Sequence, residues 1–149
     1  QLADLKCQNT PLFQARKYGV DQQYAVTFNL KDALNYGVYG NNYKNLTVFF
    51  WVDWVATRMT TPNNEYNVNP MTGVWRVPFA AIDDIRHTSP IHWYKQRNRF
   101  LETDPRMRNI LPQFEPRLIN PGGVYSIRGN NNNAACSYVL DLNRFERII

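Results

Sequence analysis

The stretch TVFFWVDWVATRM, residues 47–59, decides the fold because it is dense in β-branched and aromatic residues and contains neither Gly nor Pro. Such side chains fit the pleated surface of a β-strand. Both alternating faces of the stretch are apolar, with Phe49, Trp51 and Val55 on one and Phe50, Val52 and Trp54 on the other. A strand of this kind is covered on both sides or lies against neighbouring subunits, so we expect a central strand with Trp51 buried.

Weaker patterns surround this strand. Residues 24–30 and 136–142 alternate with a period of two, which predicts two half-buried strands. Residues 74–79 predict a short strand that Pro78 confines to an edge or an end. Residues 97–103 and 106–119 have an extended pattern that prolines fragment, and helical turns are expected only within 31–36 and 80–90. The fold class is therefore all-β: an antiparallel β-sandwich or barrel with long loops and at most one or two short helices.

The composition indicates a single folded domain. A chain of 149 residues has room for one domain, and 44% hydrophobic residues supply enough apolar surface to exclude overall disorder. The longest apolar run, residues 48–52, falls far short of the roughly 20 residues of a membrane-spanning helix, so no membrane partner is expected.

The chain is positively charged and rich in arginine. Lys and Arg total 17 against 12 Asp and Glu, for a net charge of +5, and 12 of the 17 are Arg. The planar guanidinium matches carboxylates and phosphates, which indicates anionic partners or ion-paired interfaces, with a solvated basic surface as the simpler alternative. Residues 86–117 hold seven basic and three acidic side chains, so +4 of the +5 lies in this segment.

This basic segment is the main candidate for binding. Arg97 and Arg99 would share one strand face and Arg106 and Arg108 another, with aromatic residues between them. Arginines at alternate positions beside aromatic rings neutralise phosphates and stack unpaired bases without reading sequence. We predict that these four residues contact single-stranded nucleic acid. The alternative is an Arg-rich subunit interface paired with acids.

The sequence carries no signature of catalysis. The two histidines, His87 and His92, have a spacing that suits no metal pair, and phosphate-binding loops and nucleophile motifs are missing. Adjacent Asp83 and Asp84 point apart on a helix or a strand. Asp53 lies in the most apolar strand, where pairing with an Arg is a better explanation than a catalytic role. We therefore expect no enzyme, no catalytic residues, no metal and no cofactor.

Two minor features leave alternatives open. Cys7 and Cys136 are too few and too distant for a zinc site, and they either form a disulfide or remain free thiols. Asn45-Leu46-Thr47 is a weak glycosylation motif. Together they allow a secreted β-sandwich that stacks sugars on Trp51, Trp54 or Trp93.

Three segments resemble capsid proteins of small circular single-stranded DNA viruses and related jelly-roll coats. FNLKDALNY at 28–36 is similar to their strand followed by a short Asp-containing helix, and YKNLTVFF at 43–50 to the tyrosine and basic pair before a long strand. The segment from RMR at 106–108 to FEPRL at 114–118 resembles their Arg-rich strand. The resemblance implies an eight-stranded jelly roll in an icosahedral shell whose basic inner surface faces the genome. It adds Lys44 and Arg117 to the candidate nucleic-acid contacts.

The resulting expectation is one shell domain over residues 1–149, located in the virion and partnered by copies of itself. Residues 1–15 hold one basic residue, Lys6, so we expect no disordered basic arm. Interfaces between copies favour tryptophan, which predicts subunit contacts at the four tryptophans of the chain: Trp51, Trp54, Trp75 and Trp93. A non-enzymatic accessory subunit of a large multiprotein assembly, for example an organellar one, is the alternative.

Overall fold

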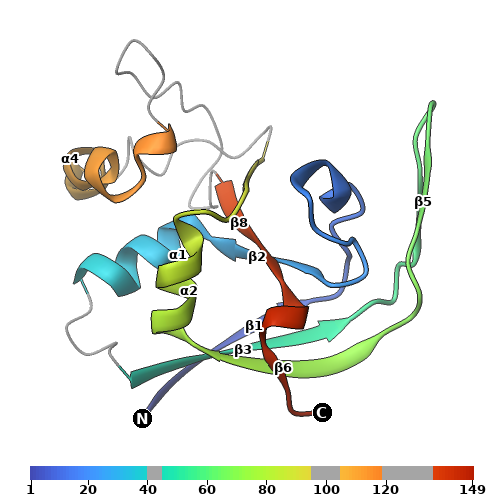
Figure 1. The fold of residues 1–149 in the computed structure, drawn as a ribbon, viewed down its shortest axis with the longest axis horizontal. Helices are drawn as coiled ribbons and strands as arrows, with labels where there is room; N and C mark the ends of the chain where they lie inside the picture. Colours follow the sequence, from blue (N-terminus) through green and yellow to red (C-terminus); the bar gives the residue numbers. More distant parts are fainter. Residues whose placement is uncertain (40–44, 95–104, 119–135) are drawn as a thin grey trace. The chain divides into compact units, whose positions relative to one another are not determined.

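The computed structural model describes residues 1–39, 45–94, 105–118 and 136–149 (Figure 1). Within these ranges the chain forms nine strands in sheets of four, three and two strands, so the β-rich prediction is confirmed. The chain divides into two compact units. The first comprises residues 1–27, 42–90 and 139–149, and the second comprises residues 28–41 and 91–138.

The first unit is built on a four-stranded sheet. Its strands are β1 (Leu2–Gln8), β3 (Leu46–Asp53), β6 (Thr72–Pro78) and β9 (Glu146–Arg147), in the order β1-β3-β6-β9. β3 therefore occupies the inner position predicted for it. The pairs β3–β6 and β6–β9 are antiparallel, whereas β1 runs parallel to β3, so this sheet is mixed and not antiparallel throughout.

Within the described ranges of the chain, only one face of β3 is covered. Val48, Phe50 and Val52 are buried on its inner face, where the ring of Phe145 stacks on Phe50 at 5.6 Å between centroids. Trp51, on the opposite face, is 49% exposed. The prediction of a buried Trp51 is wrong because nothing in the described residues forms a second layer over that face.

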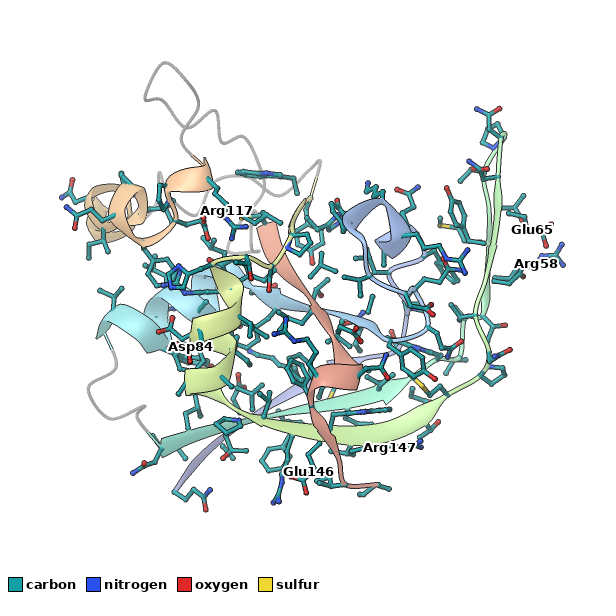
Figure 2. All side chains as sticks on the ribbon, in the orientation of Figure 1. Arg58, Glu65, Asp84, Arg117, Glu146 and Arg147 are labelled. Atoms are coloured by element: carbon teal, nitrogen blue, oxygen red, sulfur yellow. The ribbon has the colours of Figure 1, made fainter. Side chains whose placement is uncertain are left out.

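Trp54 marks the point where β3 has ended. Its side chain is 2% exposed, and the indole Nε1 donates a 2.9 Å hydrogen bond to the backbone carbonyl of Gln23. The chain leaves the sheet after Asp53 and resumes as strand β4 (Arg58–Thr60), which pairs with β5 (Glu65–Asn67) in a separate hairpin. Arg58 and Glu65 form an exposed 2.6 Å ion pair across this hairpin (Figure 2). The predicted strand over 47–59 is thus two elements.

The region after β3 contains the predicted strand and helix. Pro78 is the last residue of β6, as expected for an end position, although β6 is an inner strand of the sheet. Helix α2 (Phe79–Arg86) follows at once, inside the expected range. Its last turn is fixed by an ion pair from Arg86 Nε to Asp83 Oδ1 at 2.7 Å. The earlier 3-10 helix η1 (Ala15–Tyr18) ends at Gly19, whose φ of 77° favours glycine.

The three-stranded sheet has the order β2-β8-β7, formed by β2 (Ala25–Asn29), β8 (Cys136–Asp141) and β7 (Ile91–Trp93). The strands predicted at 24–30 and 136–142 are confirmed. β8 is buried on both faces and not on one, since Ser137 and Val139 are as inaccessible as their neighbours. The chain then forms the 3-10 helix η5 (Leu142–Arg144).

The second unit contains helices where a strand was predicted. Helix α1 (Leu30–Leu34) continues into the π-helical turn η2 (Asn35–Tyr39), as residues 31–36 indicated. Helix α4 (Pro105–Phe114) and the 3-10 turn η4 (Pro116–Leu118) replace the extended segment expected at 106–119. Pro105 stands at the first helical position, where proline is favoured, and Leu111 and Phe114 bury one helical face. With α1, α2 and α4 the described chain exceeds the two helices expected.

Candidate interaction surface

The uncovered side of the four-stranded sheet is the main candidate site, and we call it the outer face. The strand registers place twelve side chains on it: Ala3, Leu5, Cys7, Thr47, Phe49, Trp51, Asp53, Thr72, Val74, Arg76, Pro78 and Glu146. Every one of them is half-buried or exposed. The surface therefore belongs to the sheet itself, and its composition follows from the alternation of four strands.

The centre of the outer face is apolar. Leu5 on β1 lies beside Phe49 on β3, and Trp51 lies between Cys7 and Val74. Leu5 is 55% exposed and Trp51 49% exposed, and Phe49 and Val74 are half-buried. Contiguous exposed apolar side chains with a polar rim mark interaction sites in soluble proteins.

The rim of the outer face consists of paired polar groups. Arg76 donates to Glu146 through Nε at 2.6 Å and through Nη2 at 3.0 Å, and the hydrogen bonds and charge of Glu146 raise the pKa of Arg76. At the other end, the Thr72 hydroxyl donates a 2.7 Å hydrogen bond to Asp53. Asp53 is exposed and bonded to a threonine, so the arginine pairing expected for it is wrong.

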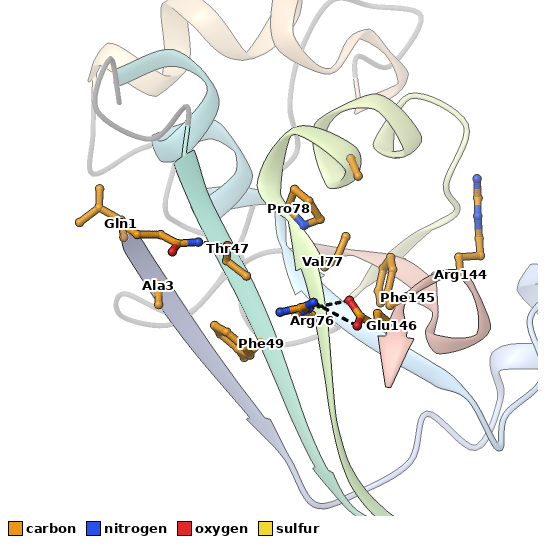
Figure 3. A pocket seen from close by; sticks show the side chains of 12 residues that line it. Gln1, Ala3, Thr47, Phe49, Arg76, Val77, Pro78, Arg144, Phe145 and Glu146 are labelled. Atoms are coloured by element: carbon orange, nitrogen blue, oxygen red, sulfur yellow. Dashed lines mark hydrogen bonds and ion pairs between the residues drawn. The ribbon is translucent and has the colours of Figure 1, made fainter. Parts of the chain in front are cut away.

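A depression of about 660 Å³ lies beside the ion pair (Figure 3) and is lined by residues from both faces of the sheet. Phe49, Arg76 and Glu146 line it together with Ala3 of β1 and Phe145. Its lining combines two aromatic rings and the Arg76–Glu146 ion pair with a further cation, Arg144.

Strand β1 forms one edge of the sheet and was not predicted from the sequence. It is the outermost strand beside β3 (Figure 3). Its alternation is inverted: Leu5 and Cys7 are exposed, whereas Asp4 and Lys6 face inward and form an ion pair at 2.9 Å. A segment with charged side chains turned in and apolar ones turned out gives no ordinary strand signal, which is why the sequence of residues 2–8 does not predict a strand.

The tryptophans predicted at subunit contacts separate into two groups. Trp51 and Trp93 are 49% and 41% exposed and are accessible to a partner. Trp54 and Trp75 are 2% and 4% exposed, because both pack into the core of the chain. The interface prediction therefore reduces to Trp51 and Trp93, and burial also removes Trp54 as a platform for stacking sugars.

Arg117 is held by a buried carboxylate in the second unit. Its Nε and Nη2 donate to Glu115 at 2.7 and 3.0 Å, and the Tyr138 hydroxyl donates to the same carboxylate at 2.8 Å. Burial acts to raise the pKa of Glu115, but the hydrogen bonds from Arg117 and Tyr138 and the guanidinium charge outweigh it, so this pKa is lowered. Arg117 thus has a structural role. In the sequence, the only indication of this ion pair is that Arg117 follows Glu115 by two residues.

The other predicted nucleic-acid contacts are not brought together among the described residues. Arg106 and Arg108 belong to helix α4 and not to the extended strand on which the prediction placed them. Lys44, Arg97 and Arg99 lie outside the described residues.

The described ranges hold no cluster of three or more His, Cys, Asp or Glu side chains that would suit a metal ion. His92 packs edge-on against Tyr94, with ring centroids 4.9 Å apart. Cys7 is exposed and Cys136 buried, and both are free thiols. Among the same residues no helix is long and apolar enough to cross a membrane.

Comparisons of the chain with protein-family models, with curated proteins and with solved structures find no match. The outer face and the β1 edge are therefore the features of the chain that indicate a function.

Proposed function

We propose that this protein is a non-enzymatic structural subunit that self-assembles into a closed shell, with a jelly-roll-type protomer and arginines that contact packaged nucleic acid. The observation that carries the proposal is the apolar outer face. An exposed Trp51 and an exposed Leu5, centred on a sheet with an open edge, are costly for an isolated protomer and favourable when copies bury them.

The shape of the outer face favours a protein partner over a small molecule. It is an open sheet surface with an aromatic centre and a neutralised polar rim, which is the arrangement of residues found in protein interfaces. The β-rich fold supports the proposal, whereas the parallel β1–β3 pair departs from the antiparallel strands of a jelly roll.

Sedimentation velocity and negative-stain imaging of the purified full chain test the assembly. The expected result is closed particles of one polypeptide that dissociate when Trp51→Ser is introduced, while the circular dichroism spectrum is unchanged. A chain that stays monomeric at all concentrations would contradict the proposal. A chain that stays small alone but joins other polypeptides would favour the accessory-subunit alternative, which the same outer face supports.

The nucleic-acid contact has its own test. Counterion release gives a slope of about −0.7 per phosphate neutralised on a single strand, so four arginines predict a slope of about −3 in log affinity against log salt. The paired change Arg97→Gln and Arg99→Gln should reduce this slope by about half. Arg117→Gln is less informative because it breaks the Glu115 pair. If an oligonucleotide does not bind the wild-type chain even at low salt, this half of the proposal fails.

A further inference from the structure

Among the described residues no strand pairs with the outer side of β1, and two side chains of opposite charge lie along this edge of the four-stranded sheet. Asp4 and Lys6 of β1 face the inner side, with side chains 20% and 24% exposed, and pair with each other at 2.9 Å. Inward-facing charges on an edge strand oppose pairing with arbitrary strands, because a new neighbour would desolvate them. A strand can dock without this penalty only if it places a base beside Asp4 and an acid beside Lys6.

Strand β1 of a second copy meets this requirement when it runs antiparallel to the first. We propose that two copies of the chain pair β1 with β1, antiparallel, about a twofold axis through Leu5. Asp4 then lies opposite Lys6 of the partner subunit, and Lys6 lies opposite Asp4 of the partner subunit. Leu5 meets the partner subunit's Leu5 on the axis.

The charges select this register over its neighbours. A twofold axis perpendicular to the sheet runs midway between one residue and its own copy, and it keeps each face of the sheet on the same side. An axis through Asp4 places two carboxylates opposite each other, and an axis through Lys6 places two ammonium groups opposite each other. Like charges in directly opposed positions destabilise a sheet, whereas opposite charges stabilise it. Of these three axes, only the one through Leu5 joins unlike charges.

The pairing also explains the inverted alternation of β1. It joins two four-stranded sheets into one, and it makes the two outer faces continuous across the axis. Leu5 loses part of its 55% exposure against its twofold mate, and the Trp51 side chains of both copies then belong to one apolar surface. This inference deepens the proposed self-assembly and rests on it, since a twofold contact is one of the contacts that a closed shell requires.

Cross-linking tests the register. In the proposed pairing Ala3 lies opposite Cys7 of the partner subunit, at the Cα separation of about 4.5 to 5.5 Å that a disulfide accepts. Ala3→Cys should therefore give a disulfide-linked dimer with copper phenanthroline as oxidant. The wild type and the double variant Ala3→Cys/Cys7→Ala are matched controls and should stay monomeric on a non-reducing gel, since equal positions lie about 13 Å apart along the strand. Absence of the cross-link in Ala3→Cys overturns the proposal, as does equal cross-linking of the double variant.

Charge reversal tests the reason for the register. Asp4→Lys and Lys6→Asp should each weaken the homodimer by about tenfold, and a mixture of the two variants should restore pairing as a heterodimer. Circular dichroism of each variant reports whether the protomer stays folded, and Lys17→Asp, outside the edge, is the control for the charge change of Lys6→Asp. Recovery in the mixture supports the proposal, and its absence from two folded variants overturns it. Particles without the Ala3→Cys cross-link would retain the proposed shell and reject this contact. The cross-link without particles would support this contact and reject the proposed shell.

Discussion

The Tyr138 hydroxyl donates a 2.8 Å hydrogen bond to Oε2 of Glu115, a side chain that is 2% exposed. Arg117 closes the other side of the same carboxylate with two hydrogen bonds. A buried carboxylate is tolerable only when its charge and its lone pairs are both matched, and here one guanidinium and one phenol do so. The arrangement ties β8 to the turn after α4, and it keeps the Arg117 guanidinium engaged with the carboxylate.

Removing the Tyr138 hydroxyl should show how much the stability of the fold depends on its hydrogen bond to Glu115. Tyr138→Phe keeps the ring and leaves Glu115 one hydrogen bond short, so we expect a loss of about 1–3 kcal/mol in the free energy of unfolding. Urea denaturation measures it. Tyr66→Phe on the β4–β5 hairpin is the matched control and should change stability by less than about 0.5 kcal/mol. Equal effects of the two substitutions would show that the Glu115 bond contributes nothing.

The lowered pKa of Glu115 predicts a dependence of stability on pH. Because the folded protein holds this group with a pKa below its ordinary value of 4.5, its contribution to stability is complete above that value. The contribution is lost as pH falls from 4.5 through the folded pKa. Unfolding free energies measured from pH 7 to pH 3 should therefore fall more steeply for the wild type than for Glu115→Gln. Parallel curves would contradict the assignment.

The sequence predicts strands well where side chains alternate normally. β3, β2 and β8 follow from their β-branched and aromatic residues, but the sequence could not say that only one face of β3 is covered, since Phe49 and Phe50 are equally apolar. The sequence does not predict helix α4, because its prolines indicate a broken strand, whereas in the structure Pro105 starts the helix. β1 was missed because its pattern is inverted, and that inversion depends on neighbours distant in sequence.

Two tryptophans three residues apart should respond differently to truncation. Trp54→Ala removes a buried indole and its hydrogen bond to Gln23, so we expect a loss of about 3–5 kcal/mol. Trp51→Ala removes a half-exposed ring from the outer face and should cost less than about 1 kcal/mol in the isolated protomer. Thermal and urea unfolding at low protein concentration measure both. A larger loss for Trp51 than for Trp54 would contradict the placement of Trp51 on the exposed outer face and of Trp54 in the core.

Gly73 of β6 has no room for a side chain. A Cβ there would lie 2.7 Å from Cζ3 of Trp75 and 2.9 Å from the backbone carbonyl oxygen of Ile149. The Trp75 ring is packed in the core, and Ile148 and Ile149 are bonded to β6 through Val74, so neither neighbour can shift freely. Gly73→Ala should therefore cost about 1–3 kcal/mol by overpacking. Calorimetry of this variant against Ala80→Gly, an exposed helical position, separates the clash from a general propensity effect.

The two thiols should differ in reactivity. Burial, together with the negative charge of Glu115, raises the pKa of Cys136 to about 12, whereas Cys7 is exposed on the outer face. At pH 8 the thiolate fraction of Cys136 is then about 10⁻⁴, and its access is blocked as well. Ellman's reagent should label one thiol per chain in the folded protein and two in urea, and Cys7→Ser should abolish the fast reaction. Rapid labelling of both thiols under native conditions would mean that β8 opens readily, and it would remove the buried setting on which the Glu115 pair depends.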